Sequence, residues 1–454
     1  MIQLRKSEGR ERCYCAEGLL AAGFLAVILV GTALLALPAA TRSGRSIGLF
    51  DSLFTATSAV CVTGLVAVDT GATFSPFGQA VLLALIQVGG LGFMMFANMI
   101  MVMLGRKITL RGRMLIRESM SSASLSDLSG LAKLYLFLAL GIELAGACVL
   151  AIRFVPMFGF KRGLWMALFH AVSAFCNAGF DLFGRFQSLT AFAGDPLVLL
   201  TVAVLIILGG LGFSVVLEVL RNRQGFRNLS LHARIVLLST LLLLVTGTLF
   251  FLLIEGSNAG TLAGQSAGGK VLNAFFQSVT LRTAGFNTVD QALLKDSSKL
   301  LGSLLMAVGA SPASTGGGMK TTTVAVLFFL MLGVVKGEKE VNVARRRISD
   351  DTVRRTLAVA ALFMTALIAG TLIIATIEDG RFPLADIVYE AASAMGTVGV
   401  SAIGTPNLHA ASRAALIPMM FLGRVGPLTL AIAVARRQGR SHRLSRFPEE
   451  KIMI

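Results

Sequence analysis

The chain has 454 residues, of which 55% are hydrophobic and 14% are charged, whereas about 25% are charged in an average globular protein. Together with a mean hydropathy of +0.78, this composition excludes a soluble enzyme, a disordered chain and a disulfide-rich secreted module. The formal net charge of +17 would indicate nucleic-acid binding in a soluble protein, but here the basic residues must first be placed relative to a membrane.

Eight segments are long and apolar enough to form membrane-spanning helices, which need about 20 residues each. They cover residues 17–40, 76–104, 131–155, 195–220, 233–254, 299–335, 355–377 and 413–435. The first follows a short basic segment, but it is too long for a signal peptide, so we expect a retained helix. Within each consecutive pair lies a shorter apolar segment that ends in glycine: 50–65, 164–180, 271–286 and 386–400. Because these segments are too short to span, we expect each to enter and leave the membrane on one side.

Lysine and arginine are concentrated before the first span, in the connectors between pairs and in the C-terminal tail. The positive-inside rule therefore predicts that both termini lie in the cytoplasm. Most of the positive charge then sets the topology, and we expect no nucleic-acid partner. The five cysteines follow neither a disulfide framework nor zinc-ligand spacing.

The four short segments align with one another without gaps on their final glycine. They read Ser58-Ala-Val-Cys-Val-Thr-Gly64, Ser173-Ala-Phe-Cys-Asn-Ala-Gly179, Val279-Thr-Leu-Arg-Thr-Ala-Gly285 and Ser393-Ala-Met-Gly-Thr-Val-Gly399. An aromatic residue stands ten positions before each glycine: Phe54, Phe169, Phe275 and Tyr389. Three positions further upstream, Asp51 and Asp386 are suited to capping a short helix. One unit therefore occurs four times, over residues 1–130, 131–232, 233–352 and 353–454.

This repeat predicts an all-α polytopic membrane protein with eight transmembrane helices and four re-entrant pore loops around one pseudo-fourfold pore. Each glycine allows neighbouring carbonyls to point at a cation in place of water, so potassium at the filter carbonyls is expected. The expected filter residues are Val62, Thr63, Gly64, Asn177, Ala178, Gly179, Thr283, Ala284, Gly285, Thr397, Val398 and Gly399. The alternative is that the glycines only allow close helix packing. Four phased copies favour the filter, whereas Gly89–Phe93 and Gly209–Phe213 are expected to be packing surfaces beside the pore.

Several motifs resemble the superfamily of potassium transporters that contains the bacterial Ktr and Trk proteins. Besides the four filter segments, they are 309–321, the run Gly423-Arg-Val-Gly-Pro-Leu-Thr-Leu430 and the tail Arg446-Phe-Pro-Glu-Glu450. The resemblance covers almost the whole chain, and with eight spans the chain is most similar to the membrane subunit of the Ktr type. It implies potassium uptake across the bacterial cytoplasmic membrane by a homodimer with one pore per protomer. Gly64 favours potassium, because sodium-carrying relatives often have serine there.

The resemblance also implies a cytoplasmic nucleotide-binding ring as regulatory partner. No cofactor is expected in this chain, the nucleotide binds to the partner, and sodium is a candidate activator. The connectors, about 106–130 and 336–355, are too short to fold a nucleotide-binding domain. Their basic residues and the tail form an expected docking face, and setting the topology and contacting anionic membrane lipids are equally good explanations for any single arginine.

The sixth span predicts a gate. Its middle, 309–323, is rich in glycine and contains Pro312, so we expect a broken helix whose loop lies in the cavity under the filter, rather than a static kink. The expected gate residues are Gly316, Gly317, Gly318, Lys320 and Arg424. Arg424 lies at the middle of the eighth span, where it would repel cations and bind the carbonyls of Gly316 to Gly318. The resemblance assigns this arginine to the gate.

Two other charged residues lie in apolar segments. Arg282, beside the third filter segment, is expected to pair with an acid or a carbonyl and hold the filter shape. Glu143, in the middle of the third span, serves either a dimer interface or a buried hydrogen bond. A membrane enzyme is not expected, because the four histidines are scattered and no catalytic motif occurs. An alternating-access cotransporter coupled to sodium or protons is the remaining alternative, although repeats of equal orientation favour a channel-like pore.

Overall fold

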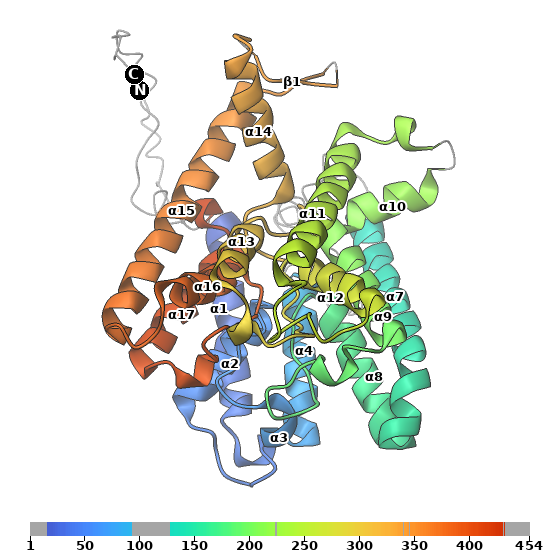
Figure 1. Cartoon of the computed structure of the whole chain (residues 1–454), viewed down its shortest axis with the longest axis vertical. Coiled ribbons are helices and arrows are strands. Elements are labelled where there is room, and N and C mark those ends of the chain that lie inside the picture. The colour runs from blue at the N-terminus through green and yellow to red at the C-terminus, as the bar shows by residue number, and fades with distance from the viewer. Residues whose placement is uncertain are drawn as a thin grey trace, which may run out of the picture.

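The computed structural model describes residues 16–92, 128–222, 225–338, 340–344, 346–429 and 431. The basic N-terminal segment, most of the 106–130 connector, the ends of the second and eighth spans and the tail at 446–450 lie outside the described residues. The described part is mostly helical (Figure 1). The only sheet among the described residues is a two-stranded antiparallel hairpin that pairs β1 (Asn342–Val343) with β2 (Arg346–Arg347).

The helices recur in one order, which is a long helix, a short helix and a second helix. The long helices are α1 (Ala16–Leu35), α7 (Leu128–Phe158), α11 (Leu231–Glu255) and α15 (Asp350–Glu378). The short ones are α2 (Leu49–Val60), α8 (Phe160–Phe175), α12 (Ala267–Thr280) and α16 (Leu384–Gly396). The second helices are α4 (Pro76–Leu91), α9 (Pro196–Leu211), α13 (Asp296–Ala307) and α17 (Ala410–Val425). Figure 1 shows the short helices in the middle of the molecule, with long helices around them.

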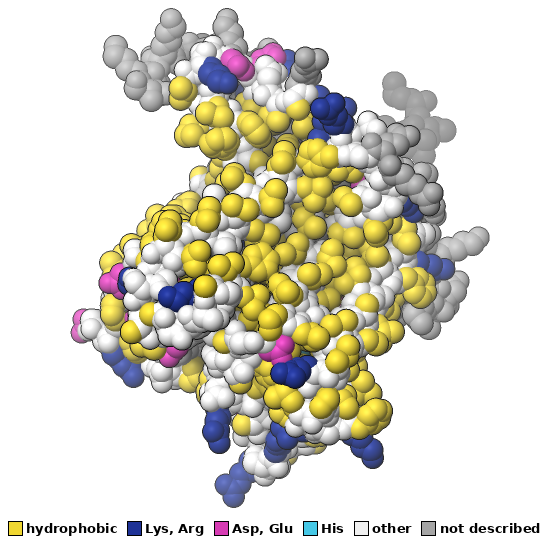
Figure 2. Space-filling model, turned by 45° about the vertical axis from the view of Figure 1, so that its right-hand side comes forward, with side chains coloured by type: hydrophobic (Ala, Val, Ile, Leu, Met, Phe, Trp, Pro, Cys, Tyr) yellow, Lys and Arg dark blue, Asp and Glu magenta, His cyan; other side chains and the backbone are white. Residues whose placement is uncertain are grey.

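The four long helices are each long and apolar enough to cross a membrane. Their outer faces stay exposed: Leu25 is 52% and Leu253 81% accessible, which is a lipid-facing surface rather than a water-facing one. Figure 2 shows this hydrophobic surface as a broad region with few charged side chains. The short helices are instead buried, and Phe54, Phe169 and Tyr389 have no exposed surface. The described helices thus form a membrane protein with a buried central layer.

Local sequence signals explain where two of the second helices, α4 and α9, begin. Ser75 accepts a hydrogen bond from the N–H of Gly78 and is followed by Pro76 at the first helical position. Asp195 accepts from Leu197 and Val198 and is followed by Pro196. A polar cap followed by proline is the usual start of a helix, because proline lacks only a donor that would be unpaired there.

The second helices end differently from the prediction of continuous spans. The expected span 195–220 is bent by 100° between α9 and α10 (Phe213–Arg221), at Gly212, whose φ is +89°. Likewise α4 ends before Gly92 (φ +85°) and α17 before Gly426 (φ +92°). Hydropathy cannot detect these breaks, because they depend on backbone angles that favour glycine.

The prediction of a broken sixth span is confirmed. Its two helices are α13 and α14 (Thr321–Val335), and residues 308–320 between them form a loop. The loop folds back on itself, since the N–H of Gly309 donates to the carbonyl of Met319 at 2.8 Å. In Figure 1, α14 and the hairpin extend away from the central layer at one end, and α3 (Thr70–Thr73) and the start of α8 lie toward the other.

Candidate functional site

The four glycine segments share one backbone geometry. The residue two positions before the glycine is left-handed in every copy, with φ of +57° at Val62, +60° at Asn177, +69° at Thr283 and +52° at Thr397. The glycines themselves have φ of +92°, +70°, +84° and +99°. A left-handed β-branched residue is rare and persists only where its surroundings hold it. The common geometry therefore indicates a common constraint on the four segments.

The constraint is that the segments contact one another in a closed ring. A Cβ atom added to Gly64 would lie 2.5 Å from the carbonyl oxygen of Ala178, and one added to Gly179 would lie 2.8 Å from that of Ala284. The same atom on Gly285 would lie 2.6 Å from the carbonyl oxygen of Val398, and on Gly399 it would collide with that of Thr63. Each glycine thus abuts the next segment, and the fourth abuts the first. Glycine is required because any side chain would enter a neighbour's carbonyl.

Hydroxyl groups tie each segment to its own short helix. The N–H of Gly64 donates to Ser58 Oγ at 3.0 Å, and the N–H of Gly399 donates to Ser393 Oγ at the same distance. In the other two segments, Ser173 and Thr280 donate to the carbonyls of Phe180 and Phe286 at 2.8 and 2.7 Å. The register of the ring is therefore set by the ends of buried helices.

A cavity of about 280 Å³ lies on one side of the ring. All four glycines line it, together with residues that follow them in the chain, including Asp69 and Asp181. Asp69 joins two of these loops, since it accepts hydrogen bonds from the N–H groups of Ala72 at 2.8 Å and Phe186 at 2.9 Å. Burial raises the pKa of the Asp181 carboxyl to about 7, and the charge of Asp69 adds to the increase while the Phe183 N–H opposes it. Two carboxyl groups that can attract cations therefore line the cavity, and burial raises the pKa of one of them.

The 308–320 loop lies at the other end of the ring. A Cβ atom on Gly316 would collide with the hydroxyl of Thr283, and one on Gly317 would collide with that of Thr397. The two threonines are the left-handed residues that precede the ring glycines, whereas the cavity is lined by the residues after them. The loop and the cavity therefore lie on opposite sides of the ring.

Hydrogen bonds hold the loop to two neighbouring helix ends, those of α9 and α17. The N–H groups of Ser311 and Thr315 donate to the carbonyls of Gly210 and Gly209 at 3.0 and 3.2 Å. The N–H of Gly318 donates to the carbonyl of Gly423 at 3.1 Å. Within the loop, Lys320 Nζ donates to the carbonyl of Gly316 at 2.8 Å. The expected residues Gly316, Gly317, Gly318 and Lys320 thus lie together under the ring.

Arg424 joins this loop to a further helix, but differently from the prediction. Its guanidinium donates to the carbonyl of Thr315, where Gly316 to Gly318 were the expected acceptors, and also to the carbonyls of Gly89 and Gly90, the latter at 3.1 Å. Arg424 lies in the last turn of α17, which ends at Val425, and the chain is helical again at 427–429. The two glycine carbonyls belong to the last turn of α4, where a positive charge is favourable.

The glycine motifs beside the ring are packing surfaces, as predicted. A Cβ atom on Gly89, Gly209 or Gly423 would collide with the carbonyl of the residue that ends, or nearly ends, the adjoining short helix: Val60, Phe175 and Met395. One signal for Arg424 is visible in this pattern. Gly423-Arg-Val-Gly aligns with Gly89-Gly-Leu-Gly and Gly209-Gly-Leu-Gly, so Arg424 occupies the position of Gly90 and Gly210. That alignment relates Arg424 to helix ends that lie beside the ring.

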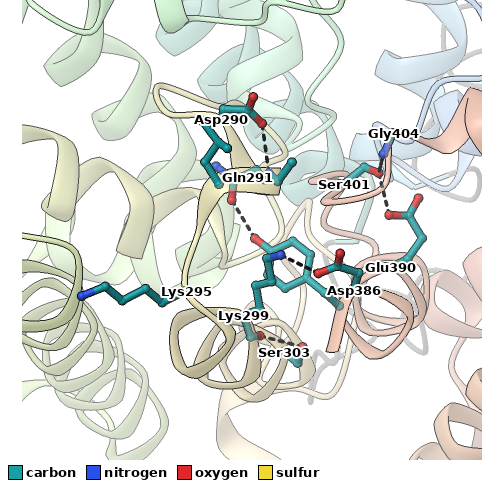
Figure 3. A network of polar contacts seen from close by, with 12 residues as sticks. Asp290, Gln291, Lys295, Lys299, Ser303, Asp386, Glu390, Ser401 and Gly404 are labelled. Atoms are coloured by element: carbon teal, nitrogen blue, oxygen red, sulfur yellow. Dashed lines mark hydrogen bonds and ion pairs between the residues drawn. The ribbon is translucent and has the colours of Figure 1, made fainter. Parts of the chain in front are cut away.

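The prediction that Asp51 and Asp386 cap the short helices is wrong. They lie in the first turns of α2 and α16, but neither helix has a side-chain cap. Asp386 instead pairs with Lys299 of α13 at 2.6 Å, as Figure 3 shows, and Asp51 pairs with Arg413 of α17 at 2.8 Å. The physical reason is that a partly buried carboxylate gains more from a cation on a neighbouring helix than from backbone N–H groups alone.

These pairs form a second recurring contact. Lys299 and Arg413 are the fourth residues of α13 and α17, and each meets the start of the short helix that follows in the ring. Gln79, the fourth residue of α4, accepts a hydrogen bond from Trp165 of α8 at 2.8 Å. Three of the four junctions are therefore polar, and Leu199 occupies the corresponding place in α9.

The fourth segment is held by a further polar network, drawn in Figure 3. The buried Glu390 of α16 accepts from Ser401 Oγ at 2.6 Å and from Thr405 Oγ1 at 2.7 Å, which fixes the loop after Gly399. Tyr389 donates to Gln291 at 2.7 Å and so joins α16 to the loop after the third segment. No periodic signal in the sequence indicates these contacts, because the other units have Thr55, His170 and Phe276 at the position of Glu390.

The structure gives a partner to each of the two charged residues in apolar segments, and only that of Arg282 differs from the prediction. Arg282 is 7% exposed, and its partner among the described residues is the hydroxyl of Thr240 at 3.4 Å rather than an acid or a carbonyl. Of the two roles left open for Glu143, the structure shows the buried hydrogen bond, since Gln87 Nε2 donates to both of its oxygens at 3.1 Å. Both are close to ring segments, since Arg282 directly precedes Thr283 and Glu143 lies 3.8 Å from the sulfur of Cys176, which precedes Asn177.

Comparisons with known proteins agree on one family. The family model of the cation transport protein TrkH matches residues 20–444. The chain is 41% identical over 419 residues to the Ktr system potassium uptake protein B of Bacillus subtilis, covering 92% of this chain and 93% of that protein. It is 36% identical over 441 residues to the potassium/sodium uptake protein NtpJ of Enterococcus hirae, covering 96% of each. The crystal structure of the potassium transporter TrkH from Vibrio parahaemolyticus is similar in fold, with a TM-score of 0.73 at 16% identity, over 96% of this chain and 88% of that one.

Proposed function

This chain belongs to the TrkH family of cation transport proteins, and from that premise we propose that it takes up potassium through a channel-like pore. At the coarser level it is a membrane transporter of the Ktr type for potassium or sodium, and not an enzyme. The proposed filter is the ring of four segments that end at Gly64, Gly179, Gly285 and Gly399.

The single observation that carries the proposal is the cyclic contact of the four glycines. Each glycine is pressed against a carbonyl of the next segment, so the backbones surround one axis at close range. Carbonyl oxygens that surround an axis can replace the hydration shell of a monovalent cation. A cavity with two carboxylates on one side supplies cations to this ring.

Potassium rather than sodium is proposed as the main substrate. All four units have glycine at the closing position, so no side chain narrows the ring. Relatives are named for potassium uptake in Bacillus subtilis and Vibrio alginolyticus, and for potassium and sodium uptake in Enterococcus hirae. The backbone ring of this chain supports transport of a monovalent cation, and it is compatible with sodium as an activator.

The 308–320 loop is proposed as the gate. It lies against Thr283 and Thr397 at the end of the ring away from the cavity, and three consecutive glycines give it backbone freedom. Arg424 and Lys320 bind its carbonyls and add positive charge beside the path. Displacement of the loop would open the path, and α14 directly continues it toward the β1–β2 hairpin.

The proposed organisation has four units, over 1–130, 131–232, 233–352 and 353–454, with eight spans around a pseudo-fourfold pore. Both termini would lie in the cytoplasm of a bacterium, and the protein would act in the cytoplasmic membrane as a homodimer. Because two relatives are named as parts of a Ktr system, a cytoplasmic nucleotide-binding ring is the proposed regulatory partner. The exposed Arg346 and Arg347 of the hairpin are part of its proposed docking face.

The experiment is a selectivity measurement on purified protein in liposomes. Gly64→Ser and Gly399→Ser each place a side chain against a carbonyl of the ring, so potassium preference over sodium should fall in both variants. Gly44→Ser is the matched control, because that glycine has no neighbour within 4 Å and its φ is also positive, at +67°. Unchanged selectivity in both ring variants would remove the basis for this filter. Unitary currents would separate the pore from alternating access, whose turnover is far lower.

A further inference from the structure

A groove at the outer edge of the molecule combines basic and apolar side chains. It has a volume of about 730 Å³ and lies between the start of α4 and the start of α8. Arg42, Lys161 and Arg162 line one part of it, and Pro76 and Trp165 are among the apolar residues that line the rest. It lies away from the ring, and the transport pathway makes no use of these cations.

Among the residues that the structure describes, no acid forms an ion pair with these three basic residues. Arg42 Nε donates to the carbonyl of Phe74 at 3.1 Å, and the guanidinium of Arg162 lies 5.7 Å from the centre of the Phe158 ring. These contacts orient the side chains but leave their positive charge uncompensated.

The start of α8 increases the positive potential of the groove. Lys161 and Arg162 lie in the first turn of this helix, whose N-cap Gly159 has no side chain to accept from the backbone N–H groups. The positive end of a helix normally attracts acids, and the corresponding turns of α2 and α16 contain Asp51 and Asp386. Two cations in the first turn of α8 instead favour binding of an anion from outside the protein, and the groove has room for such an anion.

The remaining walls indicate what kind of anion this is. Beside the groove, Phe77 is 46%, Phe160 72% and Leu164 48% exposed, and they continue the hydrophobic surface of the molecule. Figure 2 shows Lys and Arg side chains gathered at this end of the molecule, below the hydrophobic region. Trp165 lies at the same level, as tryptophan does at membrane interfaces. A free inorganic anion would not use the apolar walls.

We propose that this groove binds an anionic phospholipid, with the phosphate at Arg42, Lys161 and Arg162 and an acyl chain along Pro76 and Trp165. The groove lies at the end opposite α14 and the hairpin, which is the outer leaflet in the orientation proposed above. Basic residues are disfavoured on that side, and a bound anionic lipid offsets their charge.

The bound lipid would act on the ring through one contact. Trp165 donates to Gln79 and so joins α8 to α4 at the base of the groove. The second glycine segment follows directly from α8. A lipid that fills the groove therefore holds two neighbouring units together at a junction that has a neutral hydrogen bond but no ion pair. Retention of the lipid is independent of whether the ring conducts ions.

Trp165 is the only tryptophan of the chain, so its fluorescence reports on this groove alone. The protein is placed in phosphatidylcholine vesicles that contain a small fraction of brominated phosphatidylglycerol or brominated phosphatidylcholine, and quenching is compared. We expect the anionic lipid to reach Trp165 with a preference of about tenfold over the neutral one. Lys161→Gln with Arg162→Gln should abolish the preference. The control Arg45→Gln with Arg185→Gln, two exposed cations that do not line the groove, should keep it.

Three results would overturn the proposal. The first is equal quenching by both brominated lipids in the parent protein. The second is an undiminished preference in the Lys161 and Arg162 variant. The third is relief of quenching by millimolar inorganic phosphate, which would assign the cations to a free anion instead of a lipid. Quenching is measured without ion transport, so the proposed lipid site and the proposed pore can fail separately.

Discussion

Arg424→Ala tests whether the 308–320 loop is the barrier to ion flow. Arg424 is bound on two sides, by the carbonyl of Thr315 in the loop and by those of Gly89 and Gly90 at the end of α4. A hydrogen bond from a charged donor stabilises a protein by about 1.5–3 kcal/mol. If the displaced loop loses only the bond at Thr315, alanine should shift the loop equilibrium toward the open form by about tenfold to 150-fold. The carbonyls of α4 stay near their own helix and contribute little to this difference.

The assay is rubidium uptake into liposomes that contain the protein without any cytoplasmic partner. Arg424→Ala should raise this basal uptake toward the calculated range. Arg424→Lys is the matched control, because it keeps the charge but lacks the planar fork that reaches carbonyls on two sides. An intermediate increase for lysine would separate the bridging role from electrostatic repulsion of the ion.

One outcome would refute the reasoning about the gate. Both variants must first insert into the membrane and unfold at the temperature of the parent protein. If their uptake then equals that of the parent, neither the bridge nor the charge limits flow, and the barrier lies elsewhere. If alanine raises uptake and lysine leaves it unchanged, repulsion by the charge explains the barrier and the bridging argument is wrong.

Three further predictions follow from contacts around the ring. Because burial raises the pKa of Asp181 to about 7, its carboxylate is charged above that pH and attracts cations, so uptake should rise between external pH 6 and 8. Asp181→Asn should flatten this pH profile of uptake. A profile that is the same in the variant and the parent would contradict the role of this carboxyl. Lys299→Met leaves Asp386 without its ion-pair partner, so thermal or denaturant unfolding should show a loss of about 3–5 kcal/mol, with a smaller loss in the double variant Lys299→Met with Asp386→Leu. Glutamine at Arg346 and Arg347 of the hairpin, combined with truncation after residue 440, should abolish control of uptake by the nucleotide-binding partner but leave basal uptake intact. If nucleotide still controls uptake in this variant, the partner docks elsewhere.

The sequence predicted the four glycine segments because their information is local and periodic. Each copy carries its own short helix, its left-handed residue and its glycine, and an alignment of four copies reveals which positions are equivalent. The broken sixth span was predictable for the same reason, since three adjacent glycines and Pro312 cannot continue a helix. Such features depend on residues that lie close together in the chain.

The errors concern partners that lie far apart in the chain. Asp51 was expected to cap its own helix, but it pairs with Arg413, which is 362 residues away. Arg282 meets Thr240 from another helix, and nothing in the sequence relates the two residues. The bend at Gly212 was missed because hydropathy averages over a window and takes no account of φ. Once the units are arranged in a ring, these contacts follow from neighbouring helices.

The contacts of the loop explain why the arginine occurs in the fourth unit. The loop belongs to the third unit, and it directly contacts the second through Gly209 and Gly210 and the fourth through Gly423. Among the described contacts, Arg424 links the loop to the first unit, because it also donates to the carbonyls of Gly89 and Gly90. An arginine in place of Gly90 would force Cys176 to move, because even a Cβ atom there would lie 2.6 Å from its sulfur. The loop therefore closes against all four units, because the fourth unit supplies a side chain long enough to reach the first.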